Sequence, residues 1–242
     1  MKYPSIITQQ GAAERNTQPI IDELAKLINP STKSQILELG SGSYVHLEAF
    51  ARRWNNVQWW GTVRDEAEHG QRQYLTSSIA QARSASSRLS ENDILLSNLN
   101  GPRVLDIEIE DDWKALETAV FYGTAGPFAG FVMINLIHCC PLDAPENIFR
   151  HLSPVNPSID TKLIDTKNGW IAAYGPWLND DGSYKSDSDE KFDKEYIKSK
   201  SPLLGLRSIK SISDIASKWG FVEESRRDLP KGNVFVVWRV KP

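Results

Sequence analysis

Residues 221–240, FVEESRRDLPKGNVFVVWRV, consist of two extended runs joined by a short connection. The runs are 221–228 and 233–240, and Leu229-Pro230-Lys231-Gly232 lies between them. Two strand-like runs separated by a few residues that include glycine are a β-hairpin signal. The sequence therefore predicts an antiparallel hairpin over 221–240.

Upstream of this hairpin, short apolar runs alternate with stretches of helical spacing. The predicted strands are 35–39, 57–61, 102–106, 128–134 and 161–174, and the predicted helices are 12–29, 44–54, 65–84, 112–120, 144–152 and 209–219. Alternating strands and helices predict a parallel, doubly wound sheet. Closing such a sheet with an antiparallel hairpin is typical of class I S-adenosylmethionine (SAM) methyltransferases and not of dinucleotide dehydrogenases. We therefore predict an α/β fold with a Rossmann-like, seven-stranded sheet.

The pattern predicts a single domain over residues 1–242. Residues 1–30 are expected to form an N-terminal helical cap. Residues 178–208, which are acidic and rich in Ser and Lys at their start, are expected to be a mostly exposed insertion before the last helix.

Composition narrows the classes of partner. The formal net charge is −3, and no stripe of Lys and Arg is visible, so nucleic acid is not an expected partner. No apolar run approaches the ~20 residues that a membrane span needs. The two cysteines, Cys139 and Cys140, are adjacent, which excludes a disulfide framework, and no metal site is expected with His138 beside them. We expect a cytoplasmic protein that acts on a small molecule.

Glu38-Leu39-Gly40-Ser41-Gly42 lies where the first predicted strand passes into a helix. Glycines at this junction let the backbone pass close to a ligand. A pyrophosphate-binding turn would have a third glycine at position 45, which is Val here. The E-x-G-x-G pattern instead predicts contacts with SAM, although an ordinary tight turn remains the alternative.

Polar residues follow the other predicted strands, at the edge where open α/β sheets bind ligands. Asp65, after the second strand, is either a ribose ligand or the N-cap of the next helix. Asp106 is the candidate that faces the adenine amine. Asn135 and His138 follow the fourth strand, and His138 is either structural or a general base with an ordinary pKa of about 6.5.

Strings over nearly the whole chain resemble the methyltransferase-like 26 family, also called domain of unknown function family 938. The matching strings are Ala13-Glu14-Arg15-Asn16 with Pro19-Ile20, Glu38 to Gly42 with His46, Asn135-Leu136-Ile137-His138 with Pro141, Tyr174-Gly175-Pro176, Ser186 and Ser188 with Phe192-Asp193, Gly205 with Arg207, and Asn233. The resemblance implies a SAM-dependent methyltransferase fold, and it adds Arg15 and Asn16 as substrate-binding candidates.

Two departures from the family pattern fall on the expected SAM site. The family turn G-S-G-T-G ends in glycine, whereas this chain has Tyr44 there. The family has an acidic pair after the second strand, whereas Val63 takes the first of those positions and leaves Asp65. If SAM binds, we expect the Tyr44 ring to turn away from the glycine turn or to stack against the cofactor; a ring that fills the methionine position would prevent SAM binding.

Three functions are compatible with these features. The first is a SAM-dependent methyltransferase of a small molecule, with His138 and Tyr174 catalytic and with Tyr44 and Trp177 contacting the substrate. The second is an enzyme of the same fold that catalyses a non-methylating step, such as a cyclisation, isomerisation or pericyclic reaction. The third is a non-catalytic binding protein. For the enzymes, Gly40, Gly42, Asn135, His138 and Tyr174 are expected to line one cavity.

Overall fold

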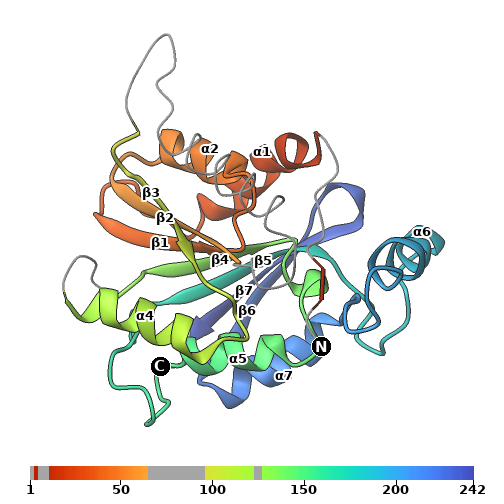
Figure 1. Ribbon diagram of the computed structural model, residues 1–242. Coiled ribbons are helices and arrows are strands. Elements are labelled where there is room, and N and C mark those ends of the chain that lie inside the picture. The colour runs from red at the N-terminus through yellow and green to blue at the C-terminus, as the bar shows by residue number, and fades with distance from the viewer. Residues whose placement is uncertain (1–2, 5–10, 65–95, 123–126) are drawn as a thin grey trace. The chain divides into compact units, whose positions relative to one another are not determined.

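The computed structural model describes residues 3–4, 11–64, 96–122 and 127–242 (Figure 1). Its strands are β1 (Ser34–Leu39), β2 (Val57–Val63), β3 (Leu99–Val104), β4 (Gly130–Ile134), β5 (Trp170–Pro176), β6 (Phe221–Asp228) and β7 (Asn233–Val240). Its α-helices are α1 (Ala12–Leu24), α2 (Val45–Arg53), α4 (Glu110–Phe121), α5 (Ala144–Leu152), α6 (Asp187–Lys191) and α7 (Ile209–Lys218). Three short helical turns are η2 (Ile137–Cys139), η3 (Phe192–Ile197) and η4 (Pro230–Gly232).

The strands form one seven-stranded sheet in the order β3-β2-β1-β4-β5-β7-β6. The pairs β1–β2 and β2–β3 are parallel, whereas β5–β7 and β6–β7 are antiparallel. The predicted fold class is therefore confirmed, and the bounds predicted for the hairpin are those observed. The predicted polar helix over 65–84 lies outside the described residues.

The fifth strand differs from its prediction. It spans Trp170–Pro176 and not 161–174. Residues before it turn instead, because the Asp165 carboxylate accepts hydrogen bonds from the backbone N–H groups of Lys167 and Asn168 at 2.8 and 3.1 Å. An Asp side chain that bonds to the backbone two residues on stabilises a turn and competes with strand pairing.

The chain divides into two compact units, an N-terminal unit of residues 8–132 and a C-terminal unit of residues 1–7 and 133–242. In the N-terminal unit, α1 and α2 lie on one face of β1 and β2, and α4 lies on the other (Figure 1). Phe50, Trp54 and Trp59 pack together between α2 and β2, with ring centroids 5.1 to 6.3 Å apart. This aromatic cluster forms part of the unit's core.

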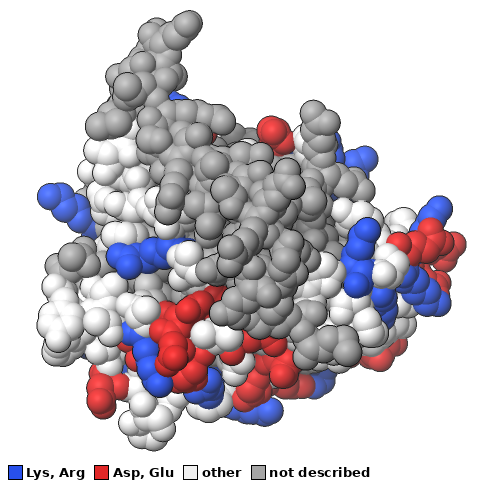
Figure 2. Space-filling view, viewed as in Figure 1, with Lys and Arg blue, Asp and Glu red and all other residues white. Residues whose placement is uncertain are grey.

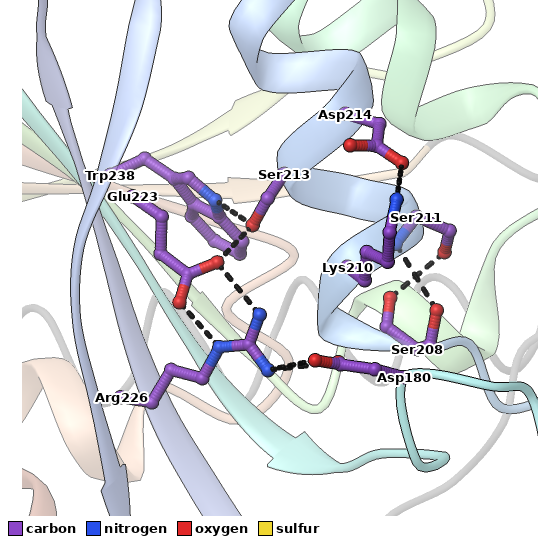
Figure 3. Close-up of polar contacts among 9 residues, drawn as sticks. All are labelled: Asp180, Ser208, Lys210, Ser211, Ser213, Asp214, Glu223, Arg226 and Trp238. Carbon is purple, nitrogen blue, oxygen red and sulfur yellow. Dashed lines mark hydrogen bonds and ion pairs between the residues drawn. The ribbon is translucent and has the colours of Figure 1, made fainter.

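In the C-terminal unit, α5 and α7 pack against each other on one face of the β5-β7-β6 sheet (Figure 1). Figure 3 shows how Arg226 connects the polar loop after β5 to this face. The Arg226 guanidinium donates to Asp180 at 2.8 Å and to Glu223. The Glu223 carboxylate also accepts a hydrogen bond from the Ser213 hydroxyl. The Ser213 oxygen accepts in turn from the Trp238 indole N–H at 2.8 Å. The chain of bonds joins β6, α7 and β7.

The segment around α6 presents side chains of both signs at the surface (Figure 2). Most of residues 179–200 are exposed, but Asp193 and Ile197 are fully buried. The segment therefore contributes to the packed interior of the C-terminal unit. Among the residues that the structure describes, no helix combines the length and the apolar composition that a membrane span needs.

Asn98 supports the N-terminal unit, because its buried Nδ2 group donates to the backbone carbonyls of Ala51, Trp54 and Val57 at 3.0 to 3.1 Å. We expect Asn98→Ala to lower the free energy of unfolding by about 2–4 kcal/mol, since it removes a buried donor to three backbone carbonyls. Urea unfolding measures the change. Asn56→Ala is the control, because exposed Asn56 makes one such bond, to Pro30. Equal losses in the two variants would contradict the assignment.

Candidate functional site

The glycine turn between β1 and α2 is fixed by the end of β2. The N–H of Gly40 donates to Thr62 Oγ1 at 2.9 Å, and the N–H of Ser41 donates to the Thr62 carbonyl at 2.8 Å. Gly40 and Gly42 have φ angles of 70° and 53°, which L side chains rarely adopt. Among the residues that the structure describes, no heavy atom lies within 4 Å of the position that a Cβ atom on Gly42 would take. The turn therefore has open space beside it.

Glu38, the last acidic residue of β1, is buried beside this turn. Its side chain is 1% exposed, and Oε2 has no hydrogen-bond partner among the described residues. Burial raises the pKa of Glu38 to about 8, and a hydrogen bond from the Ser41 side chain partly offsets this. The carboxyl group is therefore mostly protonated at neutral pH.

His46, on α2, has its Nδ1 atom 3.9 Å from Glu38 Oε1. Burial lowers the pKa of His46 to about 4, against smaller opposing effects of the Ala13 backbone and the Glu14 carboxylate. Both partners therefore lie close together mainly in their uncharged forms at neutral pH. The pair is not a conventional ion pair.

Tyr44 turns its ring away from the open space at Gly42. The residue has a φ of 68° and is fully buried, and its hydroxyl donates to the carbonyl of Asn100 at 3.0 Å. A Cβ atom on Gly61 would lie 2.3 Å from the Tyr44 ring, and one on Gly101 would lie 2.1 Å from its hydroxyl oxygen. The ring thus packs where β2 and β3 have glycines. Its assignment to substrate stays a prediction.

The acidic candidates beyond β2 and β3 have different environments. Val63, at the end of β2, is buried, and Asp65 lies outside the described residues. Asp106 is not in β3 but follows it by two residues. Its carboxylate accepts from the Glu108 N–H at 3.0 Å and so stabilises the turn into α4. Contact of Asp106 with adenine stays a prediction.

A second group of candidates meets in the C-terminal unit, where β4 and β5 end. Asn135 has a φ of 55°, and its N–H donates to the Tyr174 carbonyl at 2.8 Å. A Cβ atom on Gly175 would lie 3.4 Å from Asn135 Oδ1 and 3.5 Å from His138 Nδ1. Both polar groups therefore lie against β5 at the position of Gly175. The N-x-I-H and Y-G-P strings therefore lie next to each other.

His138 lies on η2 and is 5% exposed, with its ring centroid 5.7 Å from that of Phe192. Burial and, to a smaller extent, the Arg207 charge lower the pKa of His138 to about 4, and Asp193 opposes this. The expected pKa of about 6.5 is therefore wrong, because the imidazole is desolvated and lies near a cation. The ring is neutral at neutral pH.

The other candidates of this unit are also buried. Tyr174 is 3% exposed, and burial raises the pKa of its hydroxyl to about 12. Trp177 is 2% exposed, and its indole donates to the Val234 carbonyl at 3.2 Å and packs against Trp238. This environment is that of a core residue. A substrate contact of Trp177 stays a prediction.

The structure adds residues that the motif analysis noted without a role. Asp193 is fully buried and accepts from the Leu206 N–H at 2.7 Å and from the Tyr184 hydroxyl at 2.8 Å, and it pairs with Lys198 at 2.6 Å. Phe192 and Arg207 flank His138. The sequence signals that could have identified these residues are the F-D string of Phe192 and Asp193 and the G-x-R string that ends at Arg207.

The remaining predictions concern the relation between the two units. Gly40 and Gly42 belong to the N-terminal unit, and Asn135, His138 and Tyr174 belong to the C-terminal unit. A common cavity therefore stays a prediction. Arg15 and Asn16 lie in the first turns of α1, where Arg15 is exposed and Asn16 is half-buried. Within the described ranges, no three His, Cys, Asp or Glu side chains are grouped to hold a metal ion.

Comparison with known proteins gives both a family and a fold. The profile of a family described as "Protein of unknown function (DUF938)" matches residues 8–240. An O-methyltransferase family protein from Burkholderia thailandensis superposes with a TM-score of 0.66 at 11% identity, over 95% of this chain and 57% of that one. A putative O-methyltransferase from Nostoc punctiforme PCC 73102 gives 0.60 at 14%, over 92% and 56%.

A methyltransferase of calicheamicin biosynthesis, in its SAH-bound form, gives a TM-score of 0.58 at 10% identity, over 90% of this chain and 52% of that one. The chain thus spans just over half the length of these solved structures. At such low identity they show that the fold is that of methyltransferases.

Glu38 should make stability depend on pH. Its pKa of about 8 in the folded chain exceeds the ordinary value of 4.5, so the folded state loses stability as pH rises from about 4.5 to about 8. Glu38→Gln cannot ionise, so its stability relative to the wild type should increase over this window, by an amount on the order of 2–4 kcal/mol at pH 8. Urea unfolding at pH 5, 6, 7 and 8 measures it. Exposed Glu195→Gln is the control, and parallel profiles for wild type and Glu38→Gln would refute the assignment.

The packing of Tyr44 on Gly61 predicts strong coupling between these residues. Gly61→Ala should cost roughly 1–3 kcal/mol of stability, because the new methyl group overlaps the Tyr44 ring. In a Tyr44→Ala background the ring is absent, so Gly61→Ala should cost less than about 0.5 kcal/mol or stabilise. A double-mutant cycle of unfolding free energies measures the coupling. The same cost in both backgrounds would show that the ring lies elsewhere.

Proposed function

The chain belongs to the DUF938 family of proteins of unknown function, and on that premise we propose that it is a SAM-dependent methyltransferase that acts on a small molecule. The observation that carries the proposal is the glycine turn that follows β1 in a sheet closed by the antiparallel β6–β7 hairpin. The open space at Gly42 gives a ligand room beside the backbone.

The residues of the turn fit the methionine and ribose parts of SAM. Glu38 offers a buried carboxyl oxygen without a partner among the described residues, and α2 begins directly after the turn. The N-terminus of a helix favours a negatively charged group such as a carboxylate. Glu38, Gly40 and Gly42 would hold this part of the cofactor, and Asp65, Asp106 and Asn135 are proposed for the rest. When bound, SAM supplies a methyl group on a cationic sulfur.

On the acceptor side we propose the residues of the C-terminal unit. His138 is neutral at neutral pH, so it can accept a hydrogen bond or a proton, and Tyr174 keeps its hydroxyl proton. A base with a pKa of about 4 suits an acceptor that ionises readily, such as a phenol or an enol, better than an aliphatic alcohol. The solved neighbours named as O-methyltransferases suggest an oxygen acceptor.

The proposal extends to the setting of the protein. It includes a cytoplasmic location, a small-molecule partner and a single domain, in which 1–30 form the cap. Arg15, Asn16, Tyr44 and Trp177 are kept as substrate-side residues. Trp177 and Tyr44 would act by supporting the walls of the site, because both are buried.

One observation favours a second function. Val63 is buried at the end of β2, where a SAM site would offer a carboxylate to the ribose. A methyltransferase fold without that carboxylate suits an enzyme that performs a non-methylating step, such as a cyclisation or isomerisation, on a substrate held in the same place. Such an enzyme would not need SAM. A non-catalytic binding protein would also lack turnover.

Isothermal calorimetry with SAM and with S-adenosylhomocysteine tests the proposal. Wild type should bind both. Gly42→Leu should weaken binding at least tenfold, or about 1.4 kcal/mol, because the side chain fills the space beside the turn. Gly182→Leu is a matched control, since Gly182 also has a positive φ and open space but lies on the loop after β5. Wild type that binds neither ligand at millimolar concentration would favour the second function, and equal weakening by both variants would refute the site.

A further inference from the structure

Arg207 lies at the end of the polar segment and contacts the turn that carries His138. Its side chain is buried, and Nη1 donates to the carbonyls of Ile137 and Gly205, the second at 2.9 Å. Nη2 donates to the carbonyl of Cys140 at 2.7 Å. The guanidinium therefore bridges the two ends of the turn 137–140.

The His138 backbone is held from the same segment. Its carbonyl accepts a hydrogen bond from the Gly205 N–H at 3.2 Å. Three carbonyls of the turn, those of residues 137, 138 and 140, are thus bonded to residues 205 and 207. A planar guanidinium can reach two carbonyls at once, whereas a lysine ammonium acts as a single point charge.

A contribution to the stability of the fold does not by itself explain why a cation is buried at this position. Among the described residues Arg207 has no ion-pair partner within 4.0 Å, and its buried Nε has no hydrogen-bond partner. Burying a cation carries a large desolvation penalty, and hydrogen bonds to carbonyl oxygens offset only part of it. An apolar side chain would fill the same space at lower cost.

We propose that Arg207 is a positioning residue for His138. Its bonds fix the turn 137–140 and thereby direct the His138 imidazole toward Gly175. The inference rests on the proposed function, in which His138 contacts the acceptor. The 178–208 segment, whose composition predicts a mostly exposed insertion, then includes the support of the acceptor site.

Charged groups reach His138 from two elements of this segment. Arg207 comes from the stretch before α7, and Asp193 comes from η3, where it is paired with Lys198. The two act on the imidazole with opposite signs, Arg207 opposing its protonation and Asp193 favouring it. Phe192, which packs on the ring, carries no charge. The opposite signs allow a test that a general loosening of the fold cannot imitate.

NMR titration of the histidine imidazoles in the full chain provides the readout, with the His138 signal assigned by its loss in His138→Gln. In wild type this signal should stay that of the neutral ring down to about pH 4. Arg207→Met should raise the pKa of His138 by about one unit or more, because a cation is lost. Asp193→Asn should not raise it. A loosened turn would raise the pKa toward 6.5 in both variants, and this outcome would overturn the proposal.

Arg207→Lys separates the effect of the positive charge from that of the hydrogen bonds to the turn. It also replaces Arg207→Met in the test if that variant does not fold. A lysine keeps the positive charge but cannot bond to both ends of the turn 137–140. Because the charge is kept, the pKa of His138 should stay within about half a unit of wild type. The amide signals of residues 137–140 should nevertheless shift, and turnover should fall at least tenfold. Unchanged amide signals would overturn the positioning role. Exposed Arg227→Lys is the control and should leave the pKa of His138, the amide signals of residues 137–140 and turnover unchanged.

The His138 titration and the amide signals are measured without SAM, whereas turnover is not. A wild type that binds no SAM overturns the proposed function, whereas the titration of His138 still reports on Arg207. Conversely, SAM binding with a His138 pKa that does not respond to Arg207→Met overturns the positioning role and leaves the proposed function standing.

Discussion

The close approach of a polar or aromatic side chain to a strand backbone organises both candidate sites. For the Tyr44 ring this approach requires glycines on the strands, because a Cβ atom at Gly61 or Gly101 would overlap the ring or its hydroxyl. In the C-terminal unit Asn135 and His138 lie against β5 at Gly175. In the N-terminal unit Gly61 lets Tyr44 lie against β2. The position of the Tyr44 ring therefore depends on residues that have no side chain of their own.

Burial decides the charge state of the titratable candidates. It raises the pKa of Glu38 and lowers those of His46 and His138, so in each case the neutral form prevails near pH 7. These groups act through hydrogen bonds and shape more than through fixed charge. Arg207 is an exception among them, since its guanidinium remains cationic where it is buried. Its charge lowers the pKa of His138 further, although burial has the larger effect.

The sequence predicted the elements whose signals are local. The β6–β7 hairpin follows from the Pro-Lys-Gly connection between two extended runs, and α5 from its apolar spacing. The start of β5 was not predicted, because the residues around the Asp165 turn have a mixed apolar and polar sequence like that of a strand. The burial of Asp193 could not be predicted, because its neighbours are charged and its partner Leu206 is distant in the chain. The pKa of His138 depends likewise on Arg207, a contact that composition does not reveal.

The departure at Tyr44 also shows what local reasoning misses. A bulky residue in place of the family's third glycine suggests a blocked turn when the turn is considered alone. The ring instead extends over Gly61 and Gly101, and both positions lack the Cβ that would collide with it. Replacement of one glycine is thus matched by glycines on two neighbouring strands, and Gly42 keeps open space. The question of SAM binding therefore moves from the turn to the end of β2, where buried Val63 offers no hydrogen-bond acceptor on its side chain.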